Sequence, residues 1–197
     1  MSLKVGITGG IGSGKSIVCE IFKQLGIVVF QADLAAKQII NNNEQVKLEL
    51  ISKFGIEIYN DLGEINKTEF AKNIFNNQKN LQTVNSIIHP IVKLNFDEVA
   101  KKHNNKKYII KEAAILFESG AYKELDKIIT VSAPLEIRIK RVIERDNTER
   151  QLVIDRIKNQ ISEEERIEKS DFVIVNDEKN LLVPQILSID KILKTIK

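Results

Sequence analysis

The sequence of 197 residues contains one cysteine and lacks a hydrophobic run long enough to span a membrane. The single thiol, Cys19, excludes an intrachain disulfide and favours a reducing compartment. Its apolar neighbours indicate a small core residue rather than a reactive thiol. The apolar stretch 5–11 is short and rich in glycine, and no signal-peptide pattern is found. We therefore expect a cytoplasmic protein with no membrane partner.

An excess of charge of one sign is also missing. Lys and Arg number 30 and Asp and Glu number 27, which gives a net charge of +3. These residues are interspersed, apart from a loose basic run within 138–156, whereas nucleic-acid-binding proteins usually concentrate basic residues on one face. We expect no nucleic-acid partner. The composition, 43% apolar and 29% charged, is typical of one globular domain of this length.

Short apolar runs alternate with helical spacing along the chain. Residues 3–8 read as a buried strand that ends in glycines, a helical pattern follows over 15–25, and 27–30 read as a second strand. Strand, helix and strand in this order indicate a βαβ unit with a parallel crossover. Three further strands are predicted at 108–111, 127–132 and 171–176. The alternation predicts a three-layer α/β fold with a five-stranded parallel sheet and helices on both faces.

Two segments add helices to this core. Residues 34–103 contain no convincing strand longer than 56–59, and they read as a helical insert between the second and third strands. Residues 134–169 are long, charged and helical in pattern. We expect a single domain over 1–197, with a core of 1–33, 104–133 and 170–197, an insert at about 34–103 and a lid at about 134–169.

The stretch Gly9-x-x-x-x-Gly14-Lys15-Ser16 stands between the first strand and the first helix. This is the spacing of a phosphate-binding (P-loop) motif in its required context. Glycines let successive N–H groups point at phosphate oxygens, and the helix adds its positive end. Lys15 would reach the β- and γ-phosphates, and the Ser16 hydroxyl would hold Mg²⁺. The alternative, a glycine-rich turn before an ordinary helix, does not explain why the strand, the glycine spacing, the lysine, the serine and the helix occur together. A P-loop NTPase fold is therefore predicted.

Three classes of P-loop protein compete: a small-molecule kinase, a GTPase switch, and an ATPase that drives movement or assembly. The guanine-reading N-K-x-D motif of GTPases is missing, since its nearest match at 66–69 ends in Glu and lies in the insert. A long apolar strand that ends in Asp-Glu, usual in hydrolytic ATPases, is missing too. Both alternatives to a kinase are weakened.

Asp33 directly follows the second predicted strand. Ligands of open α/β sheets bind at the carboxyl ends of strands, so a carboxylate there could take a proton from an attacking hydroxyl. The other interpretation, an N-cap for a helix that starts at Leu34, is compatible with that role.

Arg138, Arg141 and Arg145 are spaced to share one helix face. Such a face is either solvated and paired with Glu136 and Glu144, or part of a lid over the nucleotide. A lid would neutralise the charge of the transferring phosphoryl group and exclude water.

Six further motifs accompany the loop "GITGGIGSGKS" in order: "QADLAAKQ", "IIHPIV", "ILFESG", "KRVIERD", "RIKNQ" and "SDFVIVN". This set, spread over essentially the whole chain, resembles the dephospho-CoA kinase family. The resemblance implies ATP-dependent phosphorylation of the ribose 3′-hydroxyl of dephospho-CoA, the last step of coenzyme A synthesis. ATP and Mg²⁺ are the implied cofactors, dephospho-CoA is the implied partner, and a monomer or small homo-oligomer is expected.

The resemblance also assigns residues. Asp33 is the implied catalytic base, and Lys15 and Arg141 hold the transferring phosphate. The implied ATP contacts are Gly12, Ser13, Gly14, Lys15, Ser16, Ile17, Arg145 and Asn176, with Mg²⁺ on Ser16. The implied acceptor contacts are Asp33, Lys37, His89 and Glu118.

Alternatives stay open for two of these residues. His89, followed by Pro90, could instead form a structural hydrogen bond or mark a helix break. Glu118 could be a charge at the end of a strand.

The chain departs from the family pattern at Gln31, Lys37, Ala114 and Ile17, where Asp, Arg, Pro and Thr are usual. Lysine at position 37 keeps the charge but loses bidentate phosphate binding. The competing functions are another small-molecule or nucleotide kinase, and a nucleotide-binding regulatory protein.

Overall fold

The computed structural model describes residues 2–75 and 77–196, so the outer ends of the expected core, residues 1 and 197, lie outside the description. The chain divides into two compact units. One, the sheet unit, comprises Met1–Gln31 and Ala100–Lys197; the other, the helical unit, comprises Ala32–Val99.

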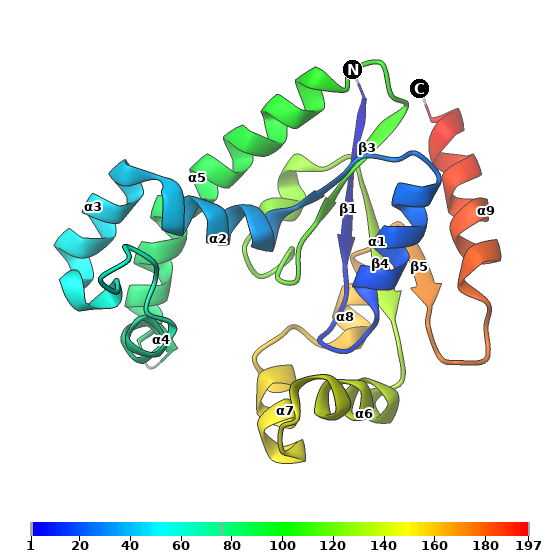
Figure 1. The fold of residues 1–197 in the computed structure, drawn as a ribbon. Helices are drawn as coiled ribbons and strands as arrows, with labels where there is room; N and C mark the ends of the chain where they lie inside the picture. Colours follow the sequence, from blue (N-terminus) through cyan, green and yellow to red (C-terminus); the bar gives the residue numbers. More distant parts are fainter. Residues whose placement is uncertain (1, 76, 197) are drawn as a thin grey trace. The chain divides into compact units, whose positions relative to one another are not determined.

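The sheet unit is built on five parallel strands in the order β2-β3-β1-β4-β5 (Figure 1). They are β1 (Leu3–Thr8), β2 (Val29–Gln31), β3 (Tyr108–Glu112), β4 (Lys127–Ser132) and β5 (Phe172–Val175). The predicted five-stranded parallel sheet is confirmed. Strand β3 lies between β1 and β2, so the first two strands of the chain are not neighbours. All carboxyl ends meet at one edge of the sheet, because every pairing is parallel.

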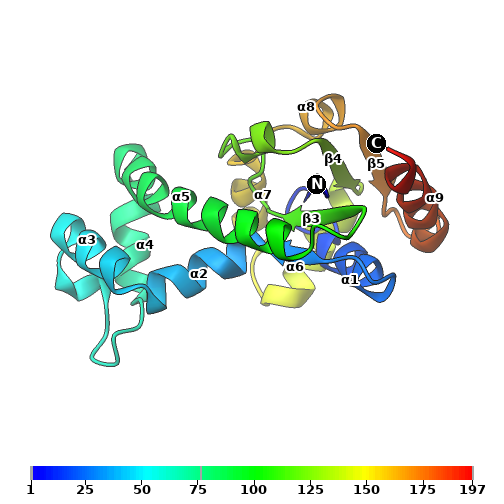
Figure 2. The same cartoon turned by 90° about the horizontal axis from the view of Figure 1, so that it is seen from above.

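Two helices, α1 (Lys15–Gln24) and α9 (Leu182–Thr195), cover one face of the sheet (Figure 2). Phe22 and Val18 of α1 and Ile186 and Leu193 of α9 are fully buried against the strands. Each such side chain contributes about 1.5–3 kcal/mol through burial. The other face carries the short 3₁₀ helix η2 (Ala121–Glu124) and α8 (Glu163–Glu168). The predicted three-layer α/β fold is confirmed.

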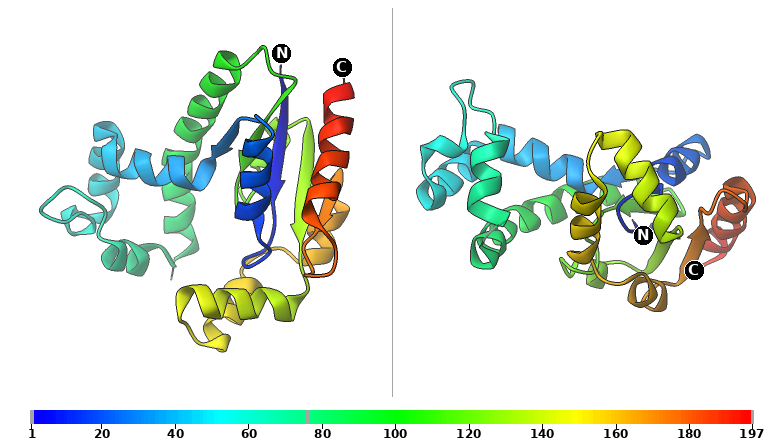
Figure 3. Two further views of the ribbon diagram at one scale, coloured as in Figure 1. Left: turned by 45° about the vertical axis from the view of Figure 1, so that its right-hand side comes forward. Right: turned by 90° about the horizontal axis from the view of Figure 1, so that it is seen from below.

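Beyond the carboxyl ends of the strands lie α6 (Leu135–Asp146) and α7 (Arg150–Lys158) (Figures 1 and 3). Their contact is a small apolar cluster centred on Ile139, Val142 and Val153. The segment predicted to be helical at 134–169 is therefore three helices, α6, α7 and α8.

The helical unit contains α2 (Ala32–Asn42), α3 (Glu44–Phe54), η1 (Ile56–Ile58), α4 (Lys67–Phe75) and most of α5 (Gln78–Lys102). The short strand considered at 56–59 is wrong. Those residues form the 3₁₀ turn η1, and only a single antiparallel bridge joins Tyr59 to Ile65. No helix in the described part of the chain is long and apolar enough to cross a membrane.

Two alternative interpretations that concern helix ends are also wrong. Helix α2 begins at Ala32, so Asp33 lies inside its first turn and is not the N-cap. Helix α5 continues through Pro90 without a break. Pro90 is exposed, whereas Ile88 and Val92 on either side of it are buried. Apolar burial along α5 thus offsets the cost of about 3 kcal/mol for an internal proline.

Candidate active site

The loop between β1 and α1 has a shape that needs glycine at two positions. Gly12 and Gly14 have φ angles of 80° and 89°, in the left-handed region. A Cβ on Gly14 would also overlap the side-chain amide of Asn176. Because Gly14 is the N-cap of α1, the loop ends on the unpaired N–H groups and positive end of that helix. This is a backbone arrangement that binds anions.

Two buried hydroxyls beside the loop fit a phosphate ligand. Thr8 Oγ1 and Ser13 Oγ have no hydrogen-bond partner among the described residues, although both residues are 1% exposed. A buried polar group without a partner costs about 1–3 kcal/mol. Phosphate oxygens would supply the missing acceptors.

The site also fits Mg²⁺. Ser16 is the second residue of α1. The described residues contain no cluster of three or more His, Cys, Asp or Glu side chains suited to a metal. Mg²⁺ bound with a nucleotide needs few protein ligands, since phosphates and waters complete its shell. The Ser16 hydroxyl is the protein ligand that this loop would offer to such an ion.

The loop lysine makes an ion pair that the sequence analysis missed. Lys15 Nζ lies 3.0 Å from Glu112 Oε1, and the two side chains are only 14% and 10% exposed. Glu112 ends β3, which pairs with β1 so that Glu112 lies opposite Ile7, just before the loop. The available signal was a carboxylate two positions after the apolar run at 108–110, at the end of a predicted strand.

Asn176 connects the loop to Arg141. It follows β5, and its Nδ2 donates to Ser13 O at 2.8 Å. Arg141 donates from Nη1 to Asn176 O at 3.3 Å and from Nη2 to Asn176 Oδ1 at 3.4 Å. Its Nη2 also contacts Glu178 Oε1 at 3.1 Å. The structure thus brings the predicted residues Arg141, Asn176 and Ser13 together.

The other two arginines of α6 have different surroundings. Arg138 is 4% exposed, and its guanidinium bonds Ile11 O and Glu163, so the interpretation of a shared solvated face is wrong. Arg145 donates two hydrogen bonds to Asp146, at 2.7 and 3.0 Å, which lower the pKa of that carboxyl. Among the contacts of the described residues, none joins Arg145 to the loop, and its role with ATP stays a prediction.

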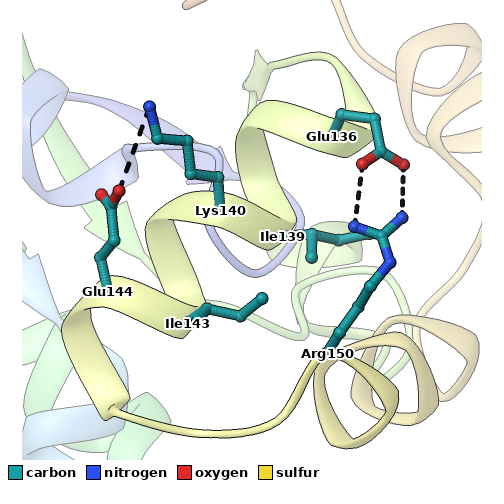
Figure 4. A pocket seen from close by; sticks show the side chains of 6 residues that line it. All are labelled: Glu136, Ile139, Lys140, Ile143, Glu144 and Arg150. Carbon is teal, nitrogen blue, oxygen red and sulfur yellow. Dashed lines mark hydrogen bonds and ion pairs between the residues drawn. The ribbon is translucent and has the colours of Figure 1, made fainter.

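The expected partners of the arginine face are paired elsewhere. Glu136 accepts two hydrogen bonds from Arg150, at 2.7 and 2.9 Å, which lower the Glu136 pKa. Glu144 lies 4.0 Å from Lys140. These residues line a shallow groove between α6 and α7 that contains none of the predicted site residues (Figure 4).

The predicted acceptor residues are spread over both units. In the helical unit, Asp33 and Lys37 are exposed and lie one turn apart on α2, and His89 is half-buried on α5. In the sheet unit, Glu118 follows β3 and its Oε1 accepts from Ile161 N at 3.2 Å. Their roles stay predictions.

Comparison with solved structures first identifies the class of protein. A shikimate kinase from Bacteroides thetaiotaomicron is 11% identical with a TM-score of 0.53, over 98% of both chains, and shares the fold. A dephospho-CoA kinase from Campylobacter jejuni is 26% identical with a TM-score of 0.71, again over 98% of both chains. A solved protein from Thermus thermophilus is 27% identical with a TM-score of 0.82, over 100% of this chain and 98% of that one. Fold and loop together define a P-loop kinase.

Sequence similarity then gives the family. Residues 3–181 match the family model of dephospho-CoA kinase. The curated dephospho-CoA kinase of Bacteroides fragilis (strain YCH46) is 40% identical, over 96% of this chain and 92% of that protein. That of Fusobacterium nucleatum is 42% identical, over 88% and 89%. The chain belongs to the dephospho-CoA kinase family, and the resemblance found in its motifs is confirmed.

Proposed function

We propose that the chain transfers the γ-phosphoryl group of ATP to the ribose 3′-hydroxyl of dephospho-CoA and so completes coenzyme A. One observation carries the proposal: a chain of this family holds a half-buried, ion-paired lysine and two buried unpaired hydroxyls around a glycine loop suited to phosphate. A P-loop kinase acts mainly by positioning and electrostatic stabilisation. The glycine loop, Lys15 and the hydroxyls of Thr8 and Ser13 would provide both.

The donor side consists of the loop and the residues that hold it. Backbone N–H groups from Gly12 to Ile17 bind the ATP phosphates, together with the Ser13 hydroxyl. Lys15 exchanges Glu112 for the transferring phosphate, and Arg141 supports the same charge from α6. Mg²⁺ on Ser16 would neutralise phosphate charge when bound. Asn176 holds Ser13, and Arg145 is a further ATP contact.

The acceptor side uses Asp33 as the base. The 3′-oxygen bonds to the γ-phosphorus while the bond between that phosphorus and the β–γ bridging oxygen breaks, and ADP leaves. The hydroxyl proton passes to the Asp33 carboxylate. Lys37, His89 and Glu118 contact dephospho-CoA, and the insert at about 34–103 forms most of its site. The core, insert and lid serve one small-molecule reaction in the cytoplasm, with no nucleic-acid or membrane partner.

An acceptor panel tests the function. The purified chain is mixed with ATP, Mg²⁺ and, separately, dephospho-CoA, nucleoside monophosphates and simple sugars, and ADP release is measured. We expect release only with dephospho-CoA. Release with a nucleoside monophosphate but not with dephospho-CoA would identify a nucleotide kinase instead. ATP binding without turnover on any acceptor would indicate a regulatory protein.

A further inference from the structure

Ile11 stands between Gly10 and Gly12 at the bend of the phosphate loop, and both polar groups of its backbone are bonded to side chains far away in sequence. Its N–H donates to Gln160 Oε1 at 2.9 Å. Its carbonyl oxygen accepts from Arg138 Nε at 3.0 Å. Gln160 follows α7 and Arg138 belongs to α6, so both partners come from the lid segment.

The Ile11 side chain is held by the same helices. It packs against the apolar cluster of Ile139 and Val142 on α6 and Val153 on α7, all of which are at most 1% exposed. One residue of the loop is thus fixed by two hydrogen bonds and by apolar burial. We call these contacts the Ile11 anchor.

Arg138 is itself held by charge. Its Nη1 lies 3.2 Å from Glu163 Oε2, and the same oxygen accepts a hydrogen bond from Arg166 Nη1 at 2.7 Å. Arg166 is 1% exposed, and burial lowers the pKa of Arg138. Buried charges are strongly destabilising unless they are paired, so the two arginines and Glu163 keep one arrangement. The Arg138 guanidinium also lies so close to Gly10 that a Cβ there would overlap it.

We propose that Gln160 and Arg138 are positioning residues for phosphoryl transfer, which act by fixing the Ile11 peptide and with it the phosphate loop. Neither residue needs to touch a substrate. The glycines on both sides leave the loop free to take other conformations, and the anchor removes that freedom. A displacement of about 1 Å in a reacting group can cost about a hundredfold in rate.

Gln160 offers the cleaner test, because it is half-buried and carries no charge. Gln160→Met keeps the length of the side chain and removes the acceptor. We expect kcat to fall about tenfold or more, with little change in the KM for dephospho-CoA or in melting temperature. Gln160→Glu keeps an acceptor oxygen, and we expect it to recover at least half of kcat at saturating ATP. Gln151→Met, at an exposed position of α7, is the matched control and should leave kcat unchanged.

A second readout does not depend on activity. This inference rests on the proposed function for its catalytic part, but hydrogen exchange at the Ile11 amide reports the anchor alone. Gln160→Met should speed that exchange about tenfold, and Gln151→Met should not. Unchanged exchange would disprove the anchor. Faster exchange with the parent kcat, or a loss of kcat that only follows a loss of thermal stability, would overturn the positioning role. An inactive parent chain would count against the proposed function instead.

Discussion

Lys15 Nζ and Glu112 Oε1 lie 3.0 Å apart at the carboxyl edge of the sheet, in a pair whose side chains are at most 14% exposed. The lysine proposed to hold the transferring phosphate is therefore already paired with an anion. In the proposed function, phosphate binding would exchange the anionic partner of Lys15, and Glu112 would keep the ammonium group at the loop until that exchange.

Substitutions in the Lys15–Glu112 pair should affect stability and activity separately. Lys15→Met leaves Glu112 buried without its cation, so the free energy of unfolding should fall by about 3 kcal/mol. Adding Glu112→Gln should restore most of that loss but none of the turnover. Urea unfolding and ATP turnover measure the two effects. Lys23→Met, which breaks an exposed pair with Glu20 on the same helix, should cost less than 1 kcal/mol. Equal costs for the two lysines would contradict a buried pair.

Asp33→Asn tests the proposed base. The variant keeps the size of the side chain on α2 but loses the proton acceptor, so ATP binding should stay nearly intact while transfer falls about a hundredfold or more. Single-turnover kinetics with dephospho-CoA measure the rate of transfer, and calorimetry measures ATP binding. Asp61→Asn, an exposed carboxylate in the same unit, is the control. Near-normal turnover in the Asp33 variant would remove Asp33 from the mechanism.

Arg141→Ala tests the lid contact with the loop. Removing the guanidinium frees Asn176, which holds Ser13 O, and takes positive charge from the transferring phosphate. We expect kcat to fall about ten- to a hundredfold and the Kd of ATP to change by less than about threefold. Lys140→Ala, at the preceding and exposed position on α6, should leave both unchanged. If only ATP affinity falls, the transition-state role is wrong.

Cys19 should be almost inert in the folded chain. Burial raises its thiol pKa to about 12, and the nearby Glu112 carboxylate adds to the shift. Because the thiolate is the reactive form, the folded chain at pH 8 should be alkylated about a thousandfold more slowly than the unfolded chain. Iodoacetamide labelling across a urea titration measures this. A native rate within tenfold of the unfolded rate would show that the thiol is accessible.

Local sequence patterns were enough to predict the sheet and the loop. The strand at 127–132 was predicted with the bounds of β4, since an apolar run of β-branched residues specifies a buried strand on its own. The glycine spacing and Lys15 likewise identified the loop. What the patterns lacked was strand order: β3 enters between β1 and β2, and only that pairing brings Glu112 to Lys15.

Long-range contacts account for the other differences. The spacing of the three arginines on α6 predicted the same surroundings for Arg138, Arg141 and Arg145. In the structure, Arg138 is buried by contacts with Glu163 and Ile11, which lie in distant parts of the chain. The rule that proline ends a helix failed at Pro90, because the apolar face of α5 is buried on both sides of it.

The central claim, transfer to the 3′-hydroxyl of dephospho-CoA, is tested most directly by ³¹P NMR of the product formed with ATP and Mg²⁺. The account predicts one new phosphomonoester on the ribose 3′-oxygen for each ADP released. It also predicts no product from the 3′-deoxy analogue of the acceptor. Phosphate on any other atom, equal reaction of the deoxy analogue, or ADP release with free phosphate as the only other product would contradict it.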